Sequence, residues 1–346
     1  MVPGPLVHPQ AAPPAPQRRR ILIVIVTATL LLASTLAVIA YQRHTSSTGA
    51  TARPPAAPDL ITVGNGPSGV AADAGGHVAY VTNSGDGTVS VIDTTTHTVT
   101  ATIAVGNRPF AVDVNPAART VYVANSEDGT VSVIDTTTNT VTATIAVGAT
   151  PATVIVDRPD TVYVANLDDG TVSVIDTTTN AVTATWHSAG ATLGAVAVDA
   201  ATGTAYATNF VDESVSVIDT TTGTITATVP VGMNPGPVDF DPRTDTVYVA
   251  NFGDGTVSAI DTTTHTVTDT IAVGGQPRAV AADPETDSVY VANGEDGTVS
   301  VIDTTTNTVT DTIAVGERPW SLAVDPATDT VYVANNADGT VSILHR

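Results

Sequence analysis

The stretch RPFAVDVNPAARTVYVANSEDGTVSVIDTTTNTVTATIAVG, residues 108–148, decides the fold. It holds four runs rich in Val, Ile, Thr and Ala, residue types that favour β-strands. Turn-forming residues separate the runs, and no run has the spacing of apolar residues that a helix needs. The stretch therefore predicts a four-stranded meander. Its strands are expected at Phe110–Val114, Thr120–Ala124, Thr130–Ile134 and Thr140–Val147.

The same pattern recurs along the chain with a period of about 42 residues. A glycine marks each copy, at Gly64, Gly106, Gly148, Gly190, Gly232, Gly274 and Gly316. A tetrapeptide that resembles Tyr-Val-Ala-Asn begins in each copy, at Tyr80, Tyr122, Tyr163, Tyr206, Tyr248, Tyr290 and Tyr332. A period of this length with only β-type segments is typical of propeller blades. Seven copies of four strands predict an all-β, seven-bladed β-propeller.

The two ends of the repeat region predict how the ring closes. Residues 60–64 read LITVG and match the fourth strand of the other copies, whereas the chain ends at Ser342–Leu344, which is a third strand. The last blade therefore lacks its outer strand, and the N-terminal strand supplies it. Such pairing removes an open sheet edge and joins the first blade to the last.

The tetrapeptide Tyr80-Val81-Thr82-Asn83 and the recurring run Asp-Gly-Thr-Val-Ser-Val-Ile-Asp resemble the YVTN β-propeller repeat family. The resemblance covers residues 59–346. It implies a seven-bladed propeller similar to surface-layer and exported bacterial proteins, many of which have no assigned chemistry. The wider group of seven-bladed relatives includes lactonases, so the resemblance implies architecture and location more than an activity.

Composition excludes several classes of function. The chain of 346 residues has no Cys, which excludes disulfides, thiolate nucleophiles and Cys-ligated metals. Residues 59–346 hold seven Arg and all 34 acidic residues, a net charge of −27. A domain this acidic is a poor partner for nucleic acid, because that binding depends on cations that meet phosphates. We expect a monomeric propeller that binds no nucleic acid.

The N-terminal segments predict attachment to a membrane. Residues 1–20 are expected to be a disordered cytoplasmic tail that ends in Arg18, Arg19 and Arg20. The apolar run that follows is about 30 Å long as a helix, which matches a bilayer core. We therefore expect a transmembrane anchor at residues 21–41, a Thr/Pro/Ala tether at 42–58 and an extracytoplasmic propeller at 59–346. The alternative is a cleaved signal peptide, although the run is long for one.

One rim of the predicted propeller varies between copies, and the other does not. The strand turns Asp-Pro-x-Thr and Asp-Thr-Thr-Thr repeat with little change, which indicates a structural role for their Asp residues. The opposite rim varies, and Arg and aromatic side chains there are typical of binding surfaces. The alternative is neutral variation in exposed loops. The predicted ligand-binding residues are Arg108, Phe110, Phe210, Asn234, Phe252, Arg278, Arg318 and Trp320.

Two acidic residues stand apart from the repeat. Asp113 and Asp239 occupy innermost strands where other copies have Ala or Ile, so each needs a hydrogen-bond partner, water or a metal. They are the candidate catalytic or metal-binding carboxylates under the hydrolase alternative, and the other interpretation is a structural hydrogen bond. The Asp-Gly pairs of the variable rim are expected to form turns, with Ca²⁺ or another divalent metal as the alternative. Otherwise no cofactor is expected.

Three functions remain open from the sequence. The first is an extracellular binding or surface-interaction module, whose partner is a small anionic ligand, a surface protein or a glycan. The second is a lactonase-like, metal-dependent hydrolase that uses Asp113 or Asp239 at the channel mouth. The third is a self-assembling component of a surface layer. The sequence contains no credible Ser-His-Asp, P-loop or GxGxxG constellation.

Overall fold

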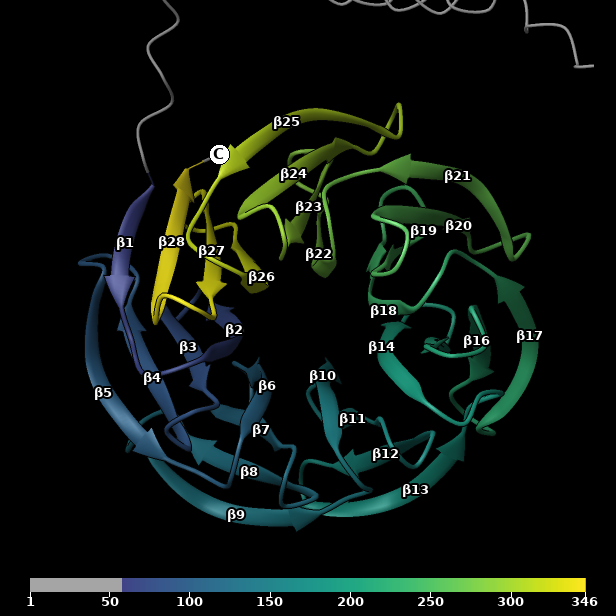
Figure 1. The fold of residues 1–346 in the computed structure, drawn as a ribbon. Helices are drawn as coiled ribbons and strands as arrows, with labels where there is room; N and C mark the ends of the chain where they lie inside the picture. The colour runs from purple at the N-terminus through teal and green to yellow at the C-terminus, as the bar shows by residue number, and fades with distance from the viewer. Residues whose placement is uncertain (1–57, 346) are drawn as a thin grey trace, which may run out of the picture. The chain divides into compact units, whose positions relative to one another are not determined.

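Seven antiparallel sheets surround a central axis in the computed structural model, which describes residues 58–345 (Figure 1). Each sheet is a blade of four strands, and the strand order within a blade follows the chain from the axis outward. Blade 1 is β2–β5, and blades 2 to 6 follow in steps of four strands. Blade 7 is β26–β28 together with β1. The predicted all-β, seven-bladed propeller is confirmed.

The strands have nearly the same bounds in every blade. The inner strands are β2 (Pro67–Asp73), β6 (Pro109–Asn115), β10 (Pro151–Arg158), β14 (Leu193–Asp199), β18 (Pro235–Asp241), β22 (Pro277–Asp283) and β26 (Pro319–Asp325). The second strands are β3 (Val78–Asn83), β7 (Thr120–Asn125), β11 (Thr161–Asn166), β15 (Thr204–Asn209), β19 (Thr246–Asn251), β23 (Ser288–Asn293) and β27 (Thr330–Asn335). The third strands are β4 (Thr88–Asp93), β8 (Thr130–Asp135), β12 (Thr171–Asp176), β16 (Ser214–Asp219), β20 (Thr256–Asp261), β24 (Thr298–Asp303) and β28 (Thr340–His345). The outer strands are β5 (Thr98–Ala104), β9 (Thr140–Ala146), β13 (Ala181–His187), β17 (Thr224–Pro230), β21 (Thr266–Ala272), β25 (Thr308–Ala314) and β1 (Asp59–Thr62).

The ring closes as the sequence predicts. β1 pairs antiparallel with β28, so that Ile61 lies opposite Val341, and the purple start of the ring lies beside its yellow end (Figure 1). The Val63 N–H extends this pairing by donating to the Gly339 carbonyl at 3.0 Å. The N-terminal strand therefore supplies the outer strand of blade 7.

The core lies between neighbouring blades, because the second and third strands are buried on both faces. In β7, five of the six residues are buried, whereas the outer strand β9 is mostly exposed. Each apolar cluster combines side chains from two adjacent blades; Tyr80 and Val91 of blade 1, for example, pack with Val112 and Val121 of blade 2. The repeated Tyr is thus a core residue, which explains why it recurs in every copy.

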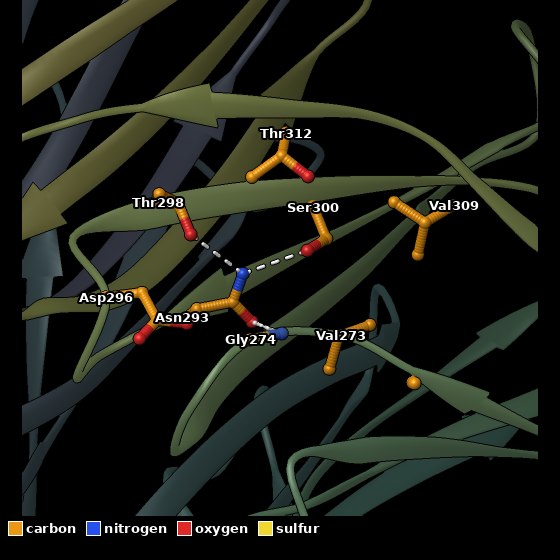
Figure 2. Close-up of a pocket in the computed structure, with 9 residues that line it drawn as sticks. Val273, Gly274, Asn293, Asp296, Thr298, Ser300, Val309 and Thr312 are labelled. Atoms are coloured by element: carbon orange, nitrogen blue, oxygen red, sulfur yellow. Dashed lines mark hydrogen bonds between the residues drawn. The ribbon is translucent and has the colours of Figure 1, made fainter. Parts of the chain in front are cut away.

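The repeated Asn joins each blade to the link that precedes it. In Figure 2, Asn293 lines a crevice of about 310 Å³ at the junction of blades 5 and 6. Its Oδ1 accepts the Gly274 N–H at 3.0 Å, and its Nδ2 donates to Thr298 Oγ1 and Ser300 Oγ. A Cβ on Gly274 would lie 2.6 Å from Asn293 Cγ, so this position requires glycine for close approach. An equivalent crevice lies between blades 2 and 3, which indicates that both belong to the repeat.

The predicted tail, anchor and most of the tether, residues 1–57, lie outside the described residues. Between residues 58 and 345 the structure contains no helix that is long and apolar enough to span a bilayer.

Candidate functional site

The positions that vary between repeats meet on one rim. In each blade, the residue after the motif Asn donates its backbone N–H to the residue two positions after the marker Gly. These seven pairs are Ser84–Gly66, Ser126–Arg108, Leu167–Thr150, Phe210–Thr192, Phe252–Asn234, Gly294–Gln276 and Asn336–Arg318. We call this the variable rim. The links between blades and the turns between second and third strands therefore share one face, as the sequence predicts.

Backbone conformation on the variable rim favours glycine, yet most blades carry a side chain there. Gly66 has a φ of 62°, and Arg108 and Arg318 take φ values of 50° and 54° at the equivalent position. A left-handed conformation costs a residue with a Cβ roughly 1–2 kcal/mol. This cost is consistent with a use for the side chains themselves.

A β-bulge places one residue of each inner strand over the channel mouth. The register between inner and second strand shifts after the first residue of the inner strand, as between Pro109 and Ala111 or Pro319 and Ser321. Bulges commonly redirect a side chain at the rim of a barrel or next to a site. The residues at this second position, which we call the mouth ring, are Ser68, Phe110, Ala152, Gly194, Gly236, Arg278 and Trp320.

Three side chains of the mouth ring and one of the variable rim form one cluster. The Arg278 Cζ lies 4.0 Å from the ring centroid of Trp320 and 4.9 Å from that of Phe252, so the guanidinium lies between two aromatic rings. Phe110 packs edge-on against Trp320, with ring centroids 6.1 Å apart. Because these residues come from blades 2, 5, 6 and 7, their side chains cross the mouth. Cation–π contacts of this kind contribute roughly 0.5–2 kcal/mol each.

The charge of Arg278 is not neutralised by an acidic side chain. Its Nη2 donates to Gln276 Oε1 at 2.9 Å, whereas its Nε is buried with no hydrogen-bond partner. Burial, and then the nearby Arg318, lower the pKa of Arg278 from its ordinary value. Within the described part of the chain, neither Arg278 nor Arg318 forms a salt bridge. A partly desolvated cation without an anion is an incomplete pair.

The remaining predicted residues surround this cluster without joining it. Arg108 is exposed and lies 3.8 Å from a Glu127 carboxylate oxygen. The Asn234 Nδ2 lies within 3.4 Å of the Phe210 carbonyl, and both residues are half-buried. Sequence reasoning missed Gln276 and Gly294 as site residues, although both occupy variable positions. Gly294 makes room for the arginine, because a Cβ there would lie 2.5 Å from Arg278 Cδ.

Asp113 and Asp239 connect neighbouring inner strands at the channel wall. Asp113 Oδ2 accepts the Val156 N–H of blade 3 at 2.7 Å, and Asp239 Oδ2 accepts the Ala282 N–H of blade 6 at 2.9 Å. The other oxygen of each carboxylate accepts the next N–H along its own strand. Inner strands have a free edge toward the axis, and these carboxylates satisfy N–H groups on it.

These contacts bear on the hydrolase alternative. Asp113 and Asp239 act at separate blade junctions, and among residues 58–345 no three His, Asp or Glu side chains gather as metal ligands. The donor set therefore does not fit a metal centre, and we derive no hydrolytic step from it.

The Asp-Gly turns of the variable rim hold the links between blades. Asp86 Oδ2 accepts the Asn65 N–H at 2.7 Å, and this bond, with a second from the Asn65 side chain, lowers the pKa of Asp86. Five further turns repeat the backbone bond, through Asp128, Asp169, Asp254, Asp296 and Asp338. The carboxylates considered as Ca²⁺ ligands are thus engaged by backbone N–H groups.

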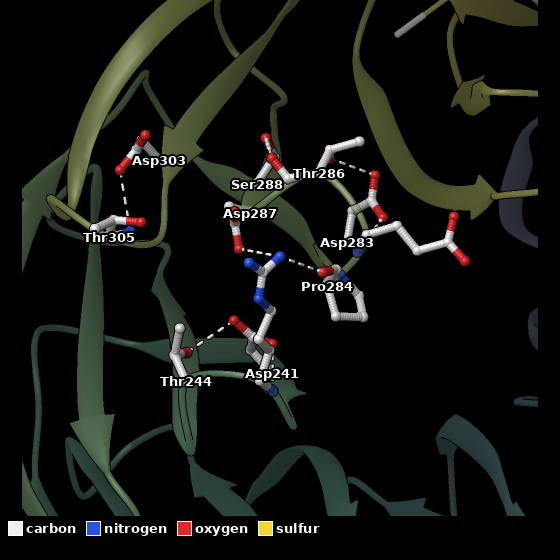
Figure 3. Close-up of polar contacts among 11 residues, drawn as sticks. Asp241, Thr244, Asp283, Pro284, Thr286, Asp287, Ser288, Asp303 and Thr305 are labelled. Atoms are coloured by element: carbon white, nitrogen blue, oxygen red, sulfur yellow. Dashed lines mark hydrogen bonds and ion pairs between the residues drawn. The ribbon is translucent and has the colours of Figure 1, made fainter.

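The opposite rim consists of turns held by Asp side chains, as predicted. In Figure 3, Asp303 Oδ1 accepts the Thr305 N–H and Asp241 Oδ2 accepts the Thr244 hydroxyl. Asp303 Oδ1 also accepts the Thr306 N–H. Arg243 links blades 5 and 6 there, through Asp287 and the Pro284 carbonyl. The Asp bonds to the turns occur in most blades, so this rim serves the fold.

The raised pKa values of Asp113 and Asp239 predict that the stability of the protein depends on pH. Burial raises the pKa of both carboxyl groups to about 6 from 3.8, against the effect of the N–H groups that bond them. Between about pH 4 and pH 6 the folded protein therefore holds more protons than the unfolded chain, and its stability falls as the pH rises. Each pKa unit corresponds to about 1.4 kcal/mol.

We expect the double variant D113N/D239N to gain stability relative to the wild type as the pH is raised from 4 to 7. Asn keeps one oxygen acceptor but does not titrate, so the variant lacks this loss of stability. The relative gain should be roughly 2–6 kcal/mol. Urea unfolding at each pH measures it, and parallel profiles for the two proteins would contradict the expectation.

Comparisons with known proteins agree with this fold. Residues 54–145, which include the first two blades, match the family model of YNCE-like beta-propellers. No curated protein matches the sequence. Among solved structures, hydrazine synthase of Kuenenia stuttgartiensis is similar, with a TM-score of 0.74 and 20% identity over 86% of this chain and 99% of that chain. At this identity the likeness concerns the fold alone. The same repeat continues through all seven blades, so the chain is a seven-bladed β-propeller whose first blades match the model of YNCE-like beta-propellers.

Proposed function

We propose that this propeller is a binding module that accepts an anionic group at the channel mouth. The observation that carries the proposal is Arg278, a half-buried guanidinium that lies between Trp320 and Phe252 with no carboxylate partner. Arg318 adds a second cation, 5.9 Å from the centroid of the same Trp320 ring. An anion would complete these charges through hydrogen bonds that are stronger than those between neutral groups.

The net negative charge of the domain restricts the attraction of anions to the channel mouth. Residues 59–346 carry −27, so anions are repelled at long range and are attracted only close to the mouth. Salt screens the long-range repulsion within about 8 Å at physiological ionic strength. Anion binding should therefore tolerate salt, unlike the binding of anions to a basic surface.

Tryptophan fluorescence tests the proposal, because the chain has only two Trp residues. Trp186 is buried in β13 beside Tyr163, so W186F leaves Trp320 as the only indole. We expect iodide to quench Trp320 more than caesium does, each relative to a free tryptophan derivative. R278Q should lower iodide quenching about fivefold, and therefore lower this ratio by at least that factor, since one charge at ~4 Å in water contributes about 1 kcal/mol.

R243Q is the matched control for R278Q. It removes the same charge from the opposite rim, where Arg243 already pairs with Asp287. The ratio of iodide to caesium quenching should stay at its wild-type value. If R243Q and R278Q change the ratio equally, or if caesium quenches Trp320 better in the wild type, the mouth does not attract anions.

We further propose that residues 21–41 anchor the protein and that the propeller lies outside the cell. The support is the uncharged apolar run that follows Arg18, Arg19 and Arg20. Protease added to intact cells should then degrade the propeller while a cytoplasmic marker survives. A propeller that stays protected until the cells are lysed would contradict this location.

A further inference from the structure

The mouth ring is filled on one side and hollow on the other. Phe110, Arg278 and Trp320 fill the positions of blades 2, 6 and 7. Blade 5 has Gly236 at the equivalent position, and a Cβ built on Gly236 would meet no atom within 4 Å beyond its two chain neighbours. Gly236 is itself buried, so the open position lies within the mouth and not on the outer surface. The hollow is thus a recess in the mouth.

This recess is specific to blade 5. The mouth-ring residue of blade 4 is also glycine, but a Cβ on Gly194 would lie 2.7 Å from Thr208 Oγ1 and 2.9 Å from the Pro235 carbonyl oxygen. Glycine at Gly194 therefore avoids a clash, whereas no clash explains the glycine at Gly236. Gly236 also has no positive φ that would require glycine.

The Arg278 guanidinium also contacts a side chain of blade 5. Phe252 belongs to blade 5, and its ring lies 4.9 Å from the Arg278 Cζ. The Thr208 hydroxyl fixes the backbone below the recess by donating to the Gly236 carbonyl at 2.8 Å. A guanidinium, an aromatic ring and a rigid recess therefore lie at the mouth of one blade.

We propose that the recess over Gly236 receives the uncharged body of a small carboxylate whose acid group pairs with Arg278. We take the body to be about one ring wide, because Gly236 leaves the position of blade 5 empty, whereas Arg278 and Trp320 fill those of blades 6 and 7. Rings of this size also pack well against aromatic faces. This inference rests on the proposed function, since it assumes that the mouth binds an anion. An aromatic acid and a uronic acid share this chemistry.

Benzoate, cyclohexanecarboxylate and glucuronate are the probes, with benzamide as the neutral control. In the full-length W186F protein, at least one of the three acids should change Trp320 emission with saturation, and benzamide should not. The benzoate and glucuronate arms distinguish an aromatic acid from a uronic acid. If no acid of the three produces saturation, the inference is wrong.

Gly236→Leu then tests the recess itself. A Cβ at this position meets no atom within 4 Å, so the midpoint of thermal unfolding should stay within a few degrees of the wild-type value. The variant should weaken binding of the acid at least about tenfold, which corresponds to about 1.4 kcal/mol. Gly194→Ala is the contrasting variant, and it should lower thermal stability because of the clash with Thr208.

Two outcomes separate this inference from the proposed function. If Gly236→Leu binds the acid as tightly as the wild type, the recess is not used, even where iodide still prefers the mouth. If iodide shows no preference for the mouth of the wild type, the proposed function itself is wrong. Loss of acid binding in Gly236→Leu with an unchanged ratio of iodide to caesium quenching supports both.

Discussion

Replacing Ile61 with Asp is expected to lower the midpoint of thermal unfolding by roughly 10–15 °C, because it separates blade 7 from the strand that closes it. Ile61 is 5% exposed and packs in one cluster with residues of blade 7, such as Tyr332 and Val341, and of blade 1, such as Ile92. The variant loses the burial of a large aliphatic side chain and places a carboxylate in an apolar site, about 4–5 kcal/mol together. One kcal/mol shifts the midpoint by about 2–4 °C in a domain of this size.

Leu60→Asp is the control for this prediction. Leu60 is next to Ile61 on β1, and its replacement introduces the same negative charge. Its side chain, however, is 57% exposed. Its replacement should change the midpoint by no more than a few degrees, as surface substitutions usually do. Equal midpoints for the two variants, measured by circular dichroism, would show that β1 does not hold the ring closed.

Deletion of residues 59–64 should also destabilise the ring, because it removes the closing strand β1. The deletion exposes the edge of β28, which otherwise pairs with β1 from Asp59 to Thr62. An exposed strand edge is a template for pairing with another chain, so the shortened protein should also self-associate. The stability of the propeller thus depends on a short strand that is distant in sequence from its partner.

The fold could be predicted from the sequence because its signals are local and repeated. The strands expected at Phe110–Val114 and Thr120–Ala124 extend by one or two residues in the structure, to Pro109–Asn115 and Thr120–Asn125. Alternation of side chains and turn residues determines such bounds within a few residues of chain. The repeats begin with the sequence of a fourth strand and end with that of a third strand, and this mismatch predicted how the ring closes. The prediction required no knowledge of distances.

The site could be predicted only as a set of positions. Variation within the repeat identified Arg278, Phe252 and Trp320, which the structure brings together. That Arg278 lies between the two rings, while Arg108 pairs with Glu127, depends on the β-bulge and on the width of the mouth. The sequence of a single blade determines neither the effect of the bulge nor the width of the mouth.

The roles of individual carboxylates and glycines could not be predicted from the sequence either. Asp113 bonds to Val156, which lies 43 positions along the chain in the next inner strand. Gly194 and Gly236 have the same residue type and the same place in their blades, yet only the second has space around its Cβ. Such differences arise from packing between blades, so they appear only once the ring is assembled.

The repeated Asn carries the second large expected effect. Asn293→Leu should destabilise the protein by roughly 3–5 kcal/mol, although leucine has the same number and branching of non-hydrogen side-chain atoms as asparagine. The substitution removes the acceptor of the Gly274 N–H and the donor to Thr298 and Ser300 (Figure 2). Asn293 is fully buried, and a buried polar group without a partner costs about 1–3 kcal/mol. The free energy of unfolding in urea measures the loss.

Asn107→Leu is the matched control, because Asn107 is exposed and its side chain bonds only to the exposed Asp128. It should cost less than about 1 kcal/mol, as a surface hydrogen bond contributes little. If Asn293→Leu and Asn107→Leu unfold at the same urea concentration, the buried Asn is not a structural cross-link. In that case the fixed tetrapeptide would need another explanation, and its Asn would become a candidate functional residue together with the variable rim above it.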